Sequence, residues 1–459
     1  MNVDLRIING TIVTAKESFK GGLAINNEKI VKIDTENNLP PAKKTINAHG
    51  NYILPGVIDA HVHFRDPGME YKEDYSTGST AAAFGGVTLV CDMPNTNPPT
   101  DNADIVRKRE ALIKEKSFID VALFGVIIPE NIDQIGSLAK AGVIGYKMYM
   151  GESFGEVLPL QDGELINAFE QVSLTGLRIG FHAESDQLLK YYLAKIKSSG
   201  RNDPMAFVES RPIICEVESI QRIALFSKYT GAKVHILHLS SKDGAMMIKE
   251  WKDKGVDITT ETCPHYLFIS ADRYMCQLKS LLRVNPPVRQ SEDGQYLFGA
   301  LLNGTIDFIT TDHAPHSIEE KVGEDIWNAN SGFIGVETSV QVMLSEAVNK
   351  RGMPLNHFVK ITSENPAKAW GLWPQKGSFQ IGSDADVTIV DLNKEWKINE
   401  INLHSKNKIT PWNNWGGMGK PISTIVRGHP IVIDEEFVAH YPIGKLISPV
   451  NKEYKEYKE

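Results

Sequence analysis

The segment Val57-Ile58-Asp59-Ala60-His61-Val62-His63-Phe64 is an apolar run that contains two histidines near its end. Alternate residues of a β-strand point to the same side, so a strand here presents His61 and His63 together. Two imidazoles on one side of a strand can bind one metal ion, although a His-x-His pair alone is only a weak indication of a site. Whether this pair indicates a metal site therefore depends on which other side chains lie near the end of the same strand.

Seven more apolar runs follow, and stretches of helical composition separate them, for example residues 74–84, 161–174, 216–229 and 244–254. Eight strands that alternate with helices predict an α/β fold, a (β/α)8 TIM barrel over residues 56–370. Strand count alone leaves an open α/β sheet as the alternative. The seven further runs are residues 87–94, 120–127, 143–150, 178–185, 233–240, 257–265 and 307–315.

Both ends of the chain differ from this central part. Residues 1–55 alternate apolar and polar positions in short pieces, with Asn9-Gly10 and Asn26-Asn27 as turn signals between them. Strand-like pieces return over residues 371–445. We therefore predict a small β-sandwich domain that both chain ends build beside the barrel. Residues 446–459 are predicted to form a polar tail.

Composition excludes several classes of partner. The formal net charge is −8 and no long basic run occurs, which argues against nucleic acid because phosphate contacts need clustered Lys and Arg. The sequence has no apolar run of about 18 residues and no basic, apolar leader, so no membrane partner is expected. Its four cysteines show no CxxC spacing and are expected to be free thiols in the cytoplasm. A small-molecule substrate is the partner that remains.

Metal-competent side chains recur at the ends of the predicted barrel strands. The C-terminal ends of barrel strands form one face, and that face carries the active site in TIM-barrel enzymes. Groups from five distant stretches are thus predicted to converge as metal ligands. They are His61 and His63 on the first strand, Lys147 on the fourth, His182 on the fifth, His238 on the sixth and Asp312 on the eighth.

A lone histidine in an apolar run is more often a satisfied core residue than a ligand. We assign that simpler role to His235 and His265. His235 is three residues from His238, and odd offsets along a strand point to opposite faces. His182 and His238 are treated as ligands because they belong to the converging set.

Lys147 lies inside the apolar run Gly145-Tyr146-Lys147-Met148-Tyr149-Met150. A lone lysine there usually extends to solvent or forms a salt bridge, because a buried unpaired ammonium is costly. An ammonium also has no lone pair for a metal ion. Reaction of the amine with CO2 would give a carbamate, whose two oxygens could bridge two metal ions.

Asp312 lies in Thr310-Thr311-Asp312-His313-Ala314-Pro315-His316. A metal pair lowers the pKa of bound water, which makes hydroxide available near neutral pH. Hydroxide could then attack an amide carbonyl. Asp312 is the predicted catalytic residue, which would take a proton from the water and deliver it to the leaving nitrogen.

This set of residues resembles the binuclear amidohydrolase superfamily, and within it the cyclic amidohydrolases, from about residue 8 to about residue 445. The resemblance implies two zinc ions in each subunit, a carboxylated Lys147 that bridges them, and a homo-oligomer, either a dimer or a tetramer. The remaining ligands that it implies are His61, His63 and Asp312 for one zinc, and His182 and His238 for the other.

Within this group the chain is similar to the dihydroorotases, which interconvert N-carbamoyl-L-aspartate and L-dihydroorotate in pyrimidine biosynthesis. Their substrates carry a carboxylate, for which an arginine fork is the best partner. In that family, residues matching Arg65, Asn95 and His316 hold this carboxylate. The run from Lys147 to residue 154 resembles the lysine-bearing dihydroorotases. The same resemblance extends to Asn285 as a substrate contact and to Ser153 as a loop contact.

Three alternatives stay open. Residues 211–220 and 326–332 look equally like allantoinase and L-hydantoinase, so a ring-opening allantoinase, or a hydantoinase or dihydropyrimidinase, is the main alternative. A non-catalytic structural relative would be expected to have lost ligands, whereas all six are present. Arg65 could also form a salt bridge at the barrel rim, with Asp66 or Glu70.

Overall fold

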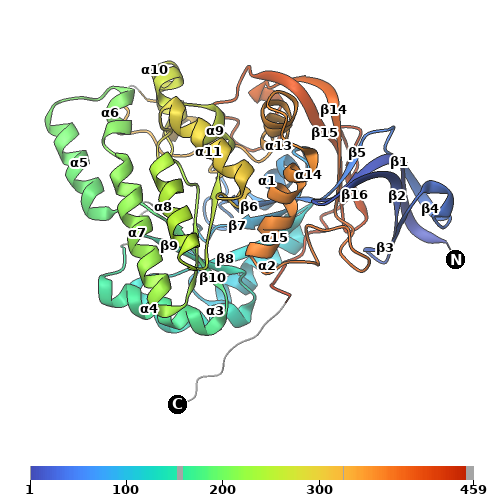
Figure 1. The fold of residues 1–459 in the computed structure, drawn as a ribbon, viewed down its shortest axis with the longest axis horizontal. Helices are drawn as coiled ribbons and strands as arrows, with labels where there is room; N and C mark the ends of the chain where they lie inside the picture. The colour runs from blue at the N-terminus through green and yellow to red at the C-terminus, as the bar shows by residue number, and fades with distance from the viewer. Residues whose placement is uncertain (1, 152–158, 324, 451–459) are drawn as a thin grey trace, which may run out of the picture.

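The computed structural model describes residues 2–151, 159–323 and 325–450. They form a barrel surrounded by helices and a separate sheet domain to one side, in which strands from the first 55 residues lie beside strands from the last part of the chain (Figure 1). No helix within these ranges is long and apolar enough to cross a membrane. The predicted loop contact Ser153 and residues 451–459 of the predicted tail lie outside the described residues.

The central sheet has eight parallel strands that follow one another in sequence order. The first and last strands meet through a parallel bridge between Val62 and His313, and the backbone N–H of His63 donates to the carbonyl oxygen of His313 at 2.8 Å. The predicted TIM barrel is therefore confirmed. Its strands are β6 (Val57–Val62), β7 (Val87–Asp92), β8 (Asp120–Val126), β9 (Gly145–Tyr149), β10 (Arg178–His182), β11 (Lys233–Ile236), β12 (Ile258–Thr262) and β13 (Phe308–Ile309).

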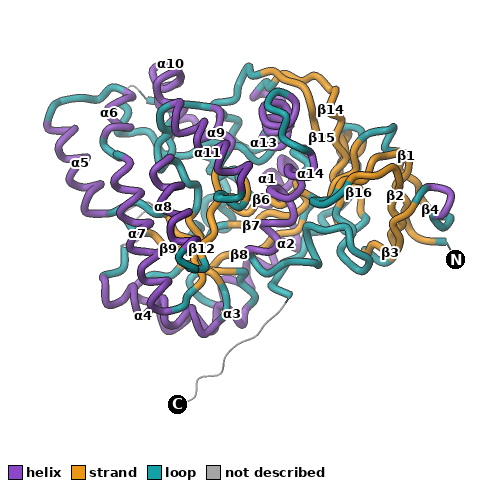
Figure 2. The backbone as a smooth tube through the Cα atoms, in the orientation of Figure 1, coloured by secondary structure: helices purple, strands orange, loops and turns teal. Residues whose placement is uncertain are grey.

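Helices surround this barrel (Figure 2). The helix α2 shows why they pack there: its buried residues Ile105, Val106, Arg109 and Ile113 share one face, and the Asn102 side chain caps its first turn. The principal outer helices are α1 (Tyr75–Phe84), α2 (Ala103–Lys116), α3 (Ile135–Ala141), α4 (Asp162–Thr175), α7 (Ile213–Thr230), α8 (Lys242–Asp253), α11 (Ser291–Asn303), α13 (Ser339–Met343), α14 (Leu355–Val359) and α15 (Asn365–Ala369).

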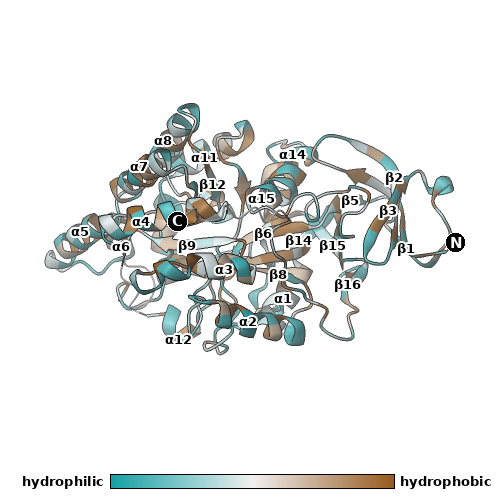
Figure 3. Ribbon diagram, turned by 90° about the horizontal axis from the view of Figure 1, so that it is seen from below, coloured by the Kyte–Doolittle hydropathy of each residue, from teal (hydrophilic) through white to brown (hydrophobic). Residues whose placement is uncertain are grey.

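Shorter or peripheral helices occupy the connections at the strand ends. They are α5 (Asp186–Ser198), α6 (Pro204–Glu209), α9 (Pro264–Phe268), α10 (Cys276–Leu278) and α12 (Ile318–Lys321). Hydrophobic residues concentrate on the central strands and on the inner sides of the helices, while hydrophilic residues lie on the outer surfaces (Figure 3). This burial of apolar surface on both faces of the strands is what a parallel barrel requires.

The second domain is one mixed sheet of nine strands, and it confirms that both chain ends build a single β domain. The strand β5 pairs with β14 from the far end of the sequence, and Ile7 and Ile12 share an apolar core with Val387, Ile389 and Ile425. Its strands are β1 (Val3–Val13), β2 (Ser18–Asn26), β3 (Lys29–Asp34), β4 (Ala42–Asn47), β5 (Tyr52–Pro55), β14 (Val387–Lys397), β15 (Gly416–Val426), β16 (His429–Ile433) and β17 (Glu436–Phe437).

The start of the predicted tail differs from the structure. Leu446 forms a parallel bridge with Val121 of β8, and the Ile447 side chain is buried against the barrel. The backbone N–H of Ile447 also donates to the carbonyl oxygen of Val121 at 2.8 Å. Two apolar residues that can cover a strand edge therefore keep residues 446–450 in the fold, which a count of polar residues did not anticipate.

A buried ion cluster ties the barrel to the sheet domain. The Lys376 ammonium lies 2.5 Å from Asp120 at the start of β8, 3.0 Å from Asp384 and 2.8 Å from Asp386, which precede β14. Arg427, directly after β15, pairs with Asp120 as well. The three carboxylates could in principle surround a metal ion, but they already surround the Lys376 ammonium. We interpret the cluster as a structural connection.

Replacement of Lys376 by methionine should destabilise the protein strongly. The change leaves three buried carboxylates short of a cation, and breaking a buried pair in this way costs about 3–5 kcal/mol. Chemical denaturation measures this loss. The control is Lys43→Met, which removes an exposed pair with Asp4 and should leave the unfolding midpoint nearly unchanged. Equal midpoints for the two variants would contradict the structural role of Lys376.

Candidate metal centre and substrate pocket

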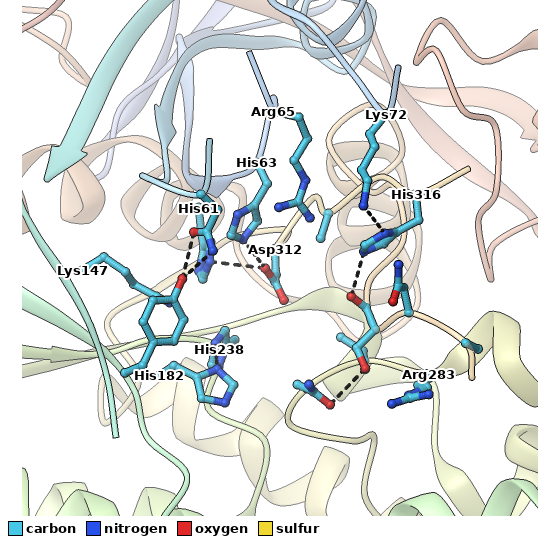
Figure 4. A pocket seen from close by; sticks show the side chains of 18 residues that line it. His61, His63, Arg65, Lys72, Lys147, His182, His238, Arg283, Asp312 and His316 are labelled. Atoms are coloured by element: carbon cyan, nitrogen blue, oxygen red, sulfur yellow. Dashed lines mark hydrogen bonds and ion pairs between the residues drawn. The ribbon is translucent and has the colours of Figure 1, made fainter. Parts of the chain in front are cut away.

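A cavity of about 340 Å³ opens where the barrel strands end. Its walls come from segments that are distant in sequence, and their polar groups point into one space (Figure 4). All ten predicted site residues within the described ranges line it. They are His61, His63, Arg65, Asn95, Lys147, His182, His238, Asn285, Asp312 and His316.

The first group of metal-competent atoms surrounds Asp312. One of its carboxylate oxygens, Oδ1, lies 3.3 Å from Nε2 of His61 and 3.2 Å from Nε2 of His63. The His61 Nε2 is buried without a hydrogen-bond partner among the described residues. Two imidazole nitrogens and a carboxylate oxygen this close together form a donor set that suits a divalent metal ion such as zinc.

The second group consists of His182 and His238. The His182 Nδ1 lies 3.1 Å from the His238 Nε2, while the His182 Nε2 faces the Glu184 carboxylate at 2.9 Å. Two ligands of one tetrahedral zinc, each bonded at about 2.1 Å, lie roughly 3.4 Å apart. The spacing of the two nitrogens therefore fits a shared metal ion, and Glu184 leaves the Nδ1 of His182 for it.

Burial keeps these imidazoles neutral. It lowers the pKa of His61 to about 3, and it holds the pKa values of His63 and His238 well below the usual range. The pKa of His182 is lowered as well, also because of burial. A neutral imidazole offers a lone pair to a metal ion, whereas a protonated one offers none. The cavity thus presents four histidines in the form that binds metal.

Lys147 on β9 is buried close to both groups. Burial lowers the pKa of its amine to about 8, so about one molecule in ten carries a neutral amine at pH 7. Its nitrogen lies 4.9 Å from the centre of the Tyr149 ring, and no described carboxylate lies within salt-bridge distance. The predicted salt-bridge alternative is therefore not seen. A neutral amine is the form that can react with CO2.

Three site residues adopt left-handed backbone conformations that are uncommon outside glycine. The φ angles are 62° at Arg65, 38° at His238 and 49° at Asp312. His238 lies two residues beyond β11, and the predicted eighth strand is regular only over β13, three residues before Asp312. The chain turns out of strand geometry at these points, which directs the side chains into the cavity. Such conformations cluster at functional sites.

Arg65 is 5% exposed, and its guanidinium has no hydrogen bond or ion pair with any described residue. The neighbouring Asp66 pairs with Lys116 at 2.8 Å, and Glu70 accepts from the backbone of Gly68, so the rim salt bridge considered for Arg65 is absent. Among the described residues, Arg65 is thus a buried cation that faces the cavity without a partner, and a guanidinium of this kind can pair with an anion.

The other predicted substrate contacts already have partners. The Asn95 amide contacts the Tyr149 hydroxyl at 2.6 and 2.9 Å. The His316 Nε2 lies 3.1 Å from the carbonyl oxygen of Ser331, and its Nδ1 lies 3.3 Å from the Lys72 ammonium. Asn285 accepts a hydrogen bond from the Ser331 hydroxyl at 3.1 Å. Of the four predicted substrate contacts that the structure describes, Arg65 is therefore the one whose side chain has no hydrogen-bond partner.

Comparison with known proteins identifies the family. The model of the amidohydrolase family matches residues 52–431. An L-hydantoinase of Paenarthrobacter aurescens is 33% identical over 98% of this chain and 99% of its own length, and an allantoinase of Deinococcus radiodurans is 33% identical over the same shares. The chain belongs to the amidohydrolase family.

Solved structures of amidohydrolases agree with this assignment. The L-hydantoinase of Arthrobacter aurescens superposes with a TM-score of 0.94 at 32% identity, over 97% of this chain and 100% of that one. A D-hydantoinase of Thermus sp. gives 0.90 at 27% identity, over 98% and 100%. The cyclic amidohydrolase branch is thus confirmed. These relatives are hydantoinases and an allantoinase, so the narrower assignment to dihydroorotase is not supported by the comparisons.

The sequence did not indicate several groups at this amidohydrolase site. Arg283 and Lys72, which pairs with Glu320 at 2.9 Å, lie in the cavity wall, and Tyr149 contributes its hydroxyl. Among the described lining residues, Asp312 is the only carboxylate. Tyr149 alone carried a usable signal, because it lies two residues from Lys147 on the same strand and therefore on the same side. Lys72 and Arg283 lie in loops that no periodic pattern places.

Two core histidines should make the metal-free protein sensitive to acid. Burial lowers the pKa of His235 and His265 to about 4, below the 6.5 of an unfolded chain. Their contribution is complete above pH 6.5 and is lost as the pH falls toward 4, since the unfolded chain then binds protons that the fold does not. Each should cost on the order of 2 kcal/mol at pH 5.

Urea unfolding of metal-free protein at pH 7.5 and pH 5 measures this loss. The matched variant is His265→Phe, because the His265 ring packs against Tyr266 and Phe333 and its Nε2 has no partner among the described residues. The difference in stability between the two pH values should shrink by about 2 kcal/mol in the variant. An unchanged difference would contradict the buried, neutral state of His265.

Proposed function

We propose that this protein is a metal-dependent hydrolase that opens a cyclic amide of the allantoin or hydantoin type. The observation that supports this most is the convergence of four neutral imidazoles, Lys147 and Asp312 on one cavity. The relatives named above, which match over nearly their full lengths, are called allantoinase and hydantoinase. Site chemistry and similarity therefore support the same class of reaction.

The donor atoms fit two zinc ions in each subunit. His61, His63 and Asp312 would hold one ion, and His182 and His238 the other, with a carboxylated Lys147 as the bridge. Nitrogen and oxygen donors of this kind are typical of catalytic zinc. When bound, such a pair lowers the pKa of water and polarises a carbonyl oxygen.

Asp312 is the residue that moves the proton in this proposal. Its carboxylate faces the cavity between the two histidines of the first group, so it can accept a proton from the attacking water. The same carboxyl would then donate that proton to the ring nitrogen as the carbon–nitrogen bond breaks. The proton thus travels from the nucleophile to the leaving group, and the ring opens to a carbamoyl product.

A second candidate substrate is dihydroorotate, a ring that carries a carboxylate. One specific observation favours it, namely the unpartnered Arg65 guanidinium in a cavity that Lys72 and Arg283 also line. Asn95, Asn285 and His316 would orient the ring or its substituent. Burial lowers the pKa of His316 to about 3, as do Arg65 and Lys72, so its ring would act as a neutral hydrogen-bonding group.

Two further expectations remain predictions. The family resemblance implies a homo-oligomer, a dimer or a tetramer, which light scattering of the purified protein would test. The cytoplasmic location inferred from composition also stays a prediction. Neither affects the chemistry of the cavity, whose lining residues described here come from one chain.

A substrate panel tests the reaction. Zinc-loaded protein, prepared with bicarbonate so that Lys147 can be carboxylated, is assayed with allantoin, hydantoin and dihydroorotate. We expect ring opening of allantoin or hydantoin. Preferred turnover of dihydroorotate would favour the second candidate within the same class of reaction. Failure to open any of the three rings, despite full zinc loading, would refute the proposed function.

Arg65→Met separates the two candidates by their substrates. The loss of a charge-assisted hydrogen bond of about 1.5–3 kcal/mol should raise KM about 10- to 100-fold for a ring with a carboxylate. The KM for unsubstituted hydantoin should stay within about twofold, and the zinc content should stay normal. Arg65→Lys, which keeps the charge without the fork, should recover part of the loss. Equal effects on both rings would remove Arg65 from carboxylate binding.

A further inference from the structure

Glu261 lies in the centre of the barrel, below the cavity. It belongs to β12, its side chain is fully buried, and it is not among the residues that line the cavity. Its carboxylate contacts three histidine residues. The Nδ1 of His61 donates to Oε1 at 2.6 Å, the backbone N–H of His238 donates to the same oxygen at 3.3 Å, and the Nε2 of His235 donates to Oε2 at 3.2 Å.

The contact with His61 decides which of its nitrogens reaches the first group. Because Nδ1 donates to Glu261, the lone pair of the neutral ring is on Nε2. That nitrogen is the one that lies 3.3 Å from the Asp312 carboxylate. Glu261 therefore fixes both the tautomer and the orientation of the His61 ring, as a carboxylate behind a ligating histidine generally does.

The contact with His238 acts on the second group through the backbone. His238 has a φ of 38°, a conformation that a residue with a side chain adopts only when its surroundings hold it. The hydrogen bond from its N–H to Glu261 is one such restraint. Its imidazole Nε2 lies 3.1 Å from the Nδ1 of His182. A single carboxylate oxygen thus touches one member of each group.

His235 holds the Glu261 carboxylate from behind. Its Nε2 carries the proton toward Glu261, because a carboxylate can only accept, and its Nδ1 lies 2.8 Å from the Thr259 hydroxyl, which can donate to it. The ring also stacks on Phe308, with ring centres 5.0 Å apart and planes 7° from parallel. His235 is thus fixed on two sides, and the carboxylate cannot rotate without losing a hydrogen bond.

Glu184 offers a contrast within the same site. It lies 2.9 Å from the Nε2 of His182 and is itself held by Arg211. Among the described candidate ligands, Glu184 contacts His182 alone, in the second group. Glu184 should therefore influence one metal position, whereas Glu261 is built to influence both.

We propose that Glu261 is the positioning residue that sets both metal positions at once, with His235 as its support. This inference rests on the metal pair of the proposed function. Glutamine is the sharpest substitution, because it keeps the size and shape but replaces one acceptor oxygen by an NH2 donor. In either orientation of that amide, an N–H group would face an N–H group of His61 and His238 or of His235, unless a ring changes its tautomer.

The test is zinc binding by full-length Glu261→Gln, measured by competition with a chromophoric chelator and by metal analysis. Both zinc ions should bind about 10- to 100-fold more weakly than in the wild type. Glu184→Gln should weaken one of the two ions. The matched control is Glu216→Gln, a buried carboxylate whose partners are Ser240 and Ser241, and it should bind both ions as the wild type does.

If Glu261 had a purely structural role, its replacement by glutamine would lower the stability of the protein without changing the two metal sites. Cobalt(II) in place of zinc reports this difference, because its visible spectrum depends on the arrangement of its ligands; we expect the spectrum of Glu261→Gln to change. If Glu261→Gln does not fold, His235→Phe keeps the stacking on Phe308 and removes only the support, and it should weaken both ions several-fold.

Three outcomes would overturn the inference. Folded Glu261→Gln with zinc affinities and a cobalt spectrum like those of the wild type is the first, and His235→Phe with unchanged affinities is the second. Weakening of only one ion by Glu261→Gln is the third. In these cases the metal centre of the proposed function stands if the wild type binds two zinc ions, and ring opening by the wild type still tests the function itself. A wild type that binds no zinc would instead overturn the metal centre, and this inference with it.

Discussion

The burial of several nitrogen donors around one carboxylate is the constraint on which the site depends. Four imidazoles and an amine line the cavity, while Asp312 is the only carboxylate among the described lining residues. Desolvation favours their neutral forms, and the nitrogen and oxygen atoms of each group lie 3.1–3.3 Å apart. The arrangement persists because the barrel holds it, and a shared cation is what would satisfy it.

Successive shells of the fold hold these donor groups in place. The parallel strands bring the groups to one face, and buried carboxylates below that face hold the imidazoles, as Glu261 does for His61 and Glu184 for His182. Further away, Lys376 and its three aspartates join β8 of the barrel to a sheet made from both ends of the chain. A site that must present donors within a few tenths of an ångström needs such support, because a looser scaffold would let each donor find another partner.

Local periodicity explains which features the sequence could predict. The alternation at His61 and His63 and the eight apolar runs follow from strand geometry, so the barrel and the converging ligands were recognisable, as was the core position of His235. The left-handed turns at Arg65, His238 and Asp312 leave no periodic signal. His316 contacts Glu320 four residues further on, which is a local spacing, but its contacts with Ser331 and with Lys72, more than two hundred residues away, follow from no local pattern.

The two lines of argument about the substrate concern different parts of the molecule. Identity over nearly the whole chain supports the shared fold and the class of reaction. Arg65, Lys72 and Arg283 lie on the substrate side of the cavity, where few residues decide which ring fits. Burying a guanidinium without a partner costs desolvation free energy unless a bound anion pairs with it. The similarity therefore assigns the class of reaction, while Arg65 is the residue whose substitution distinguishes a ring with a carboxylate from one without.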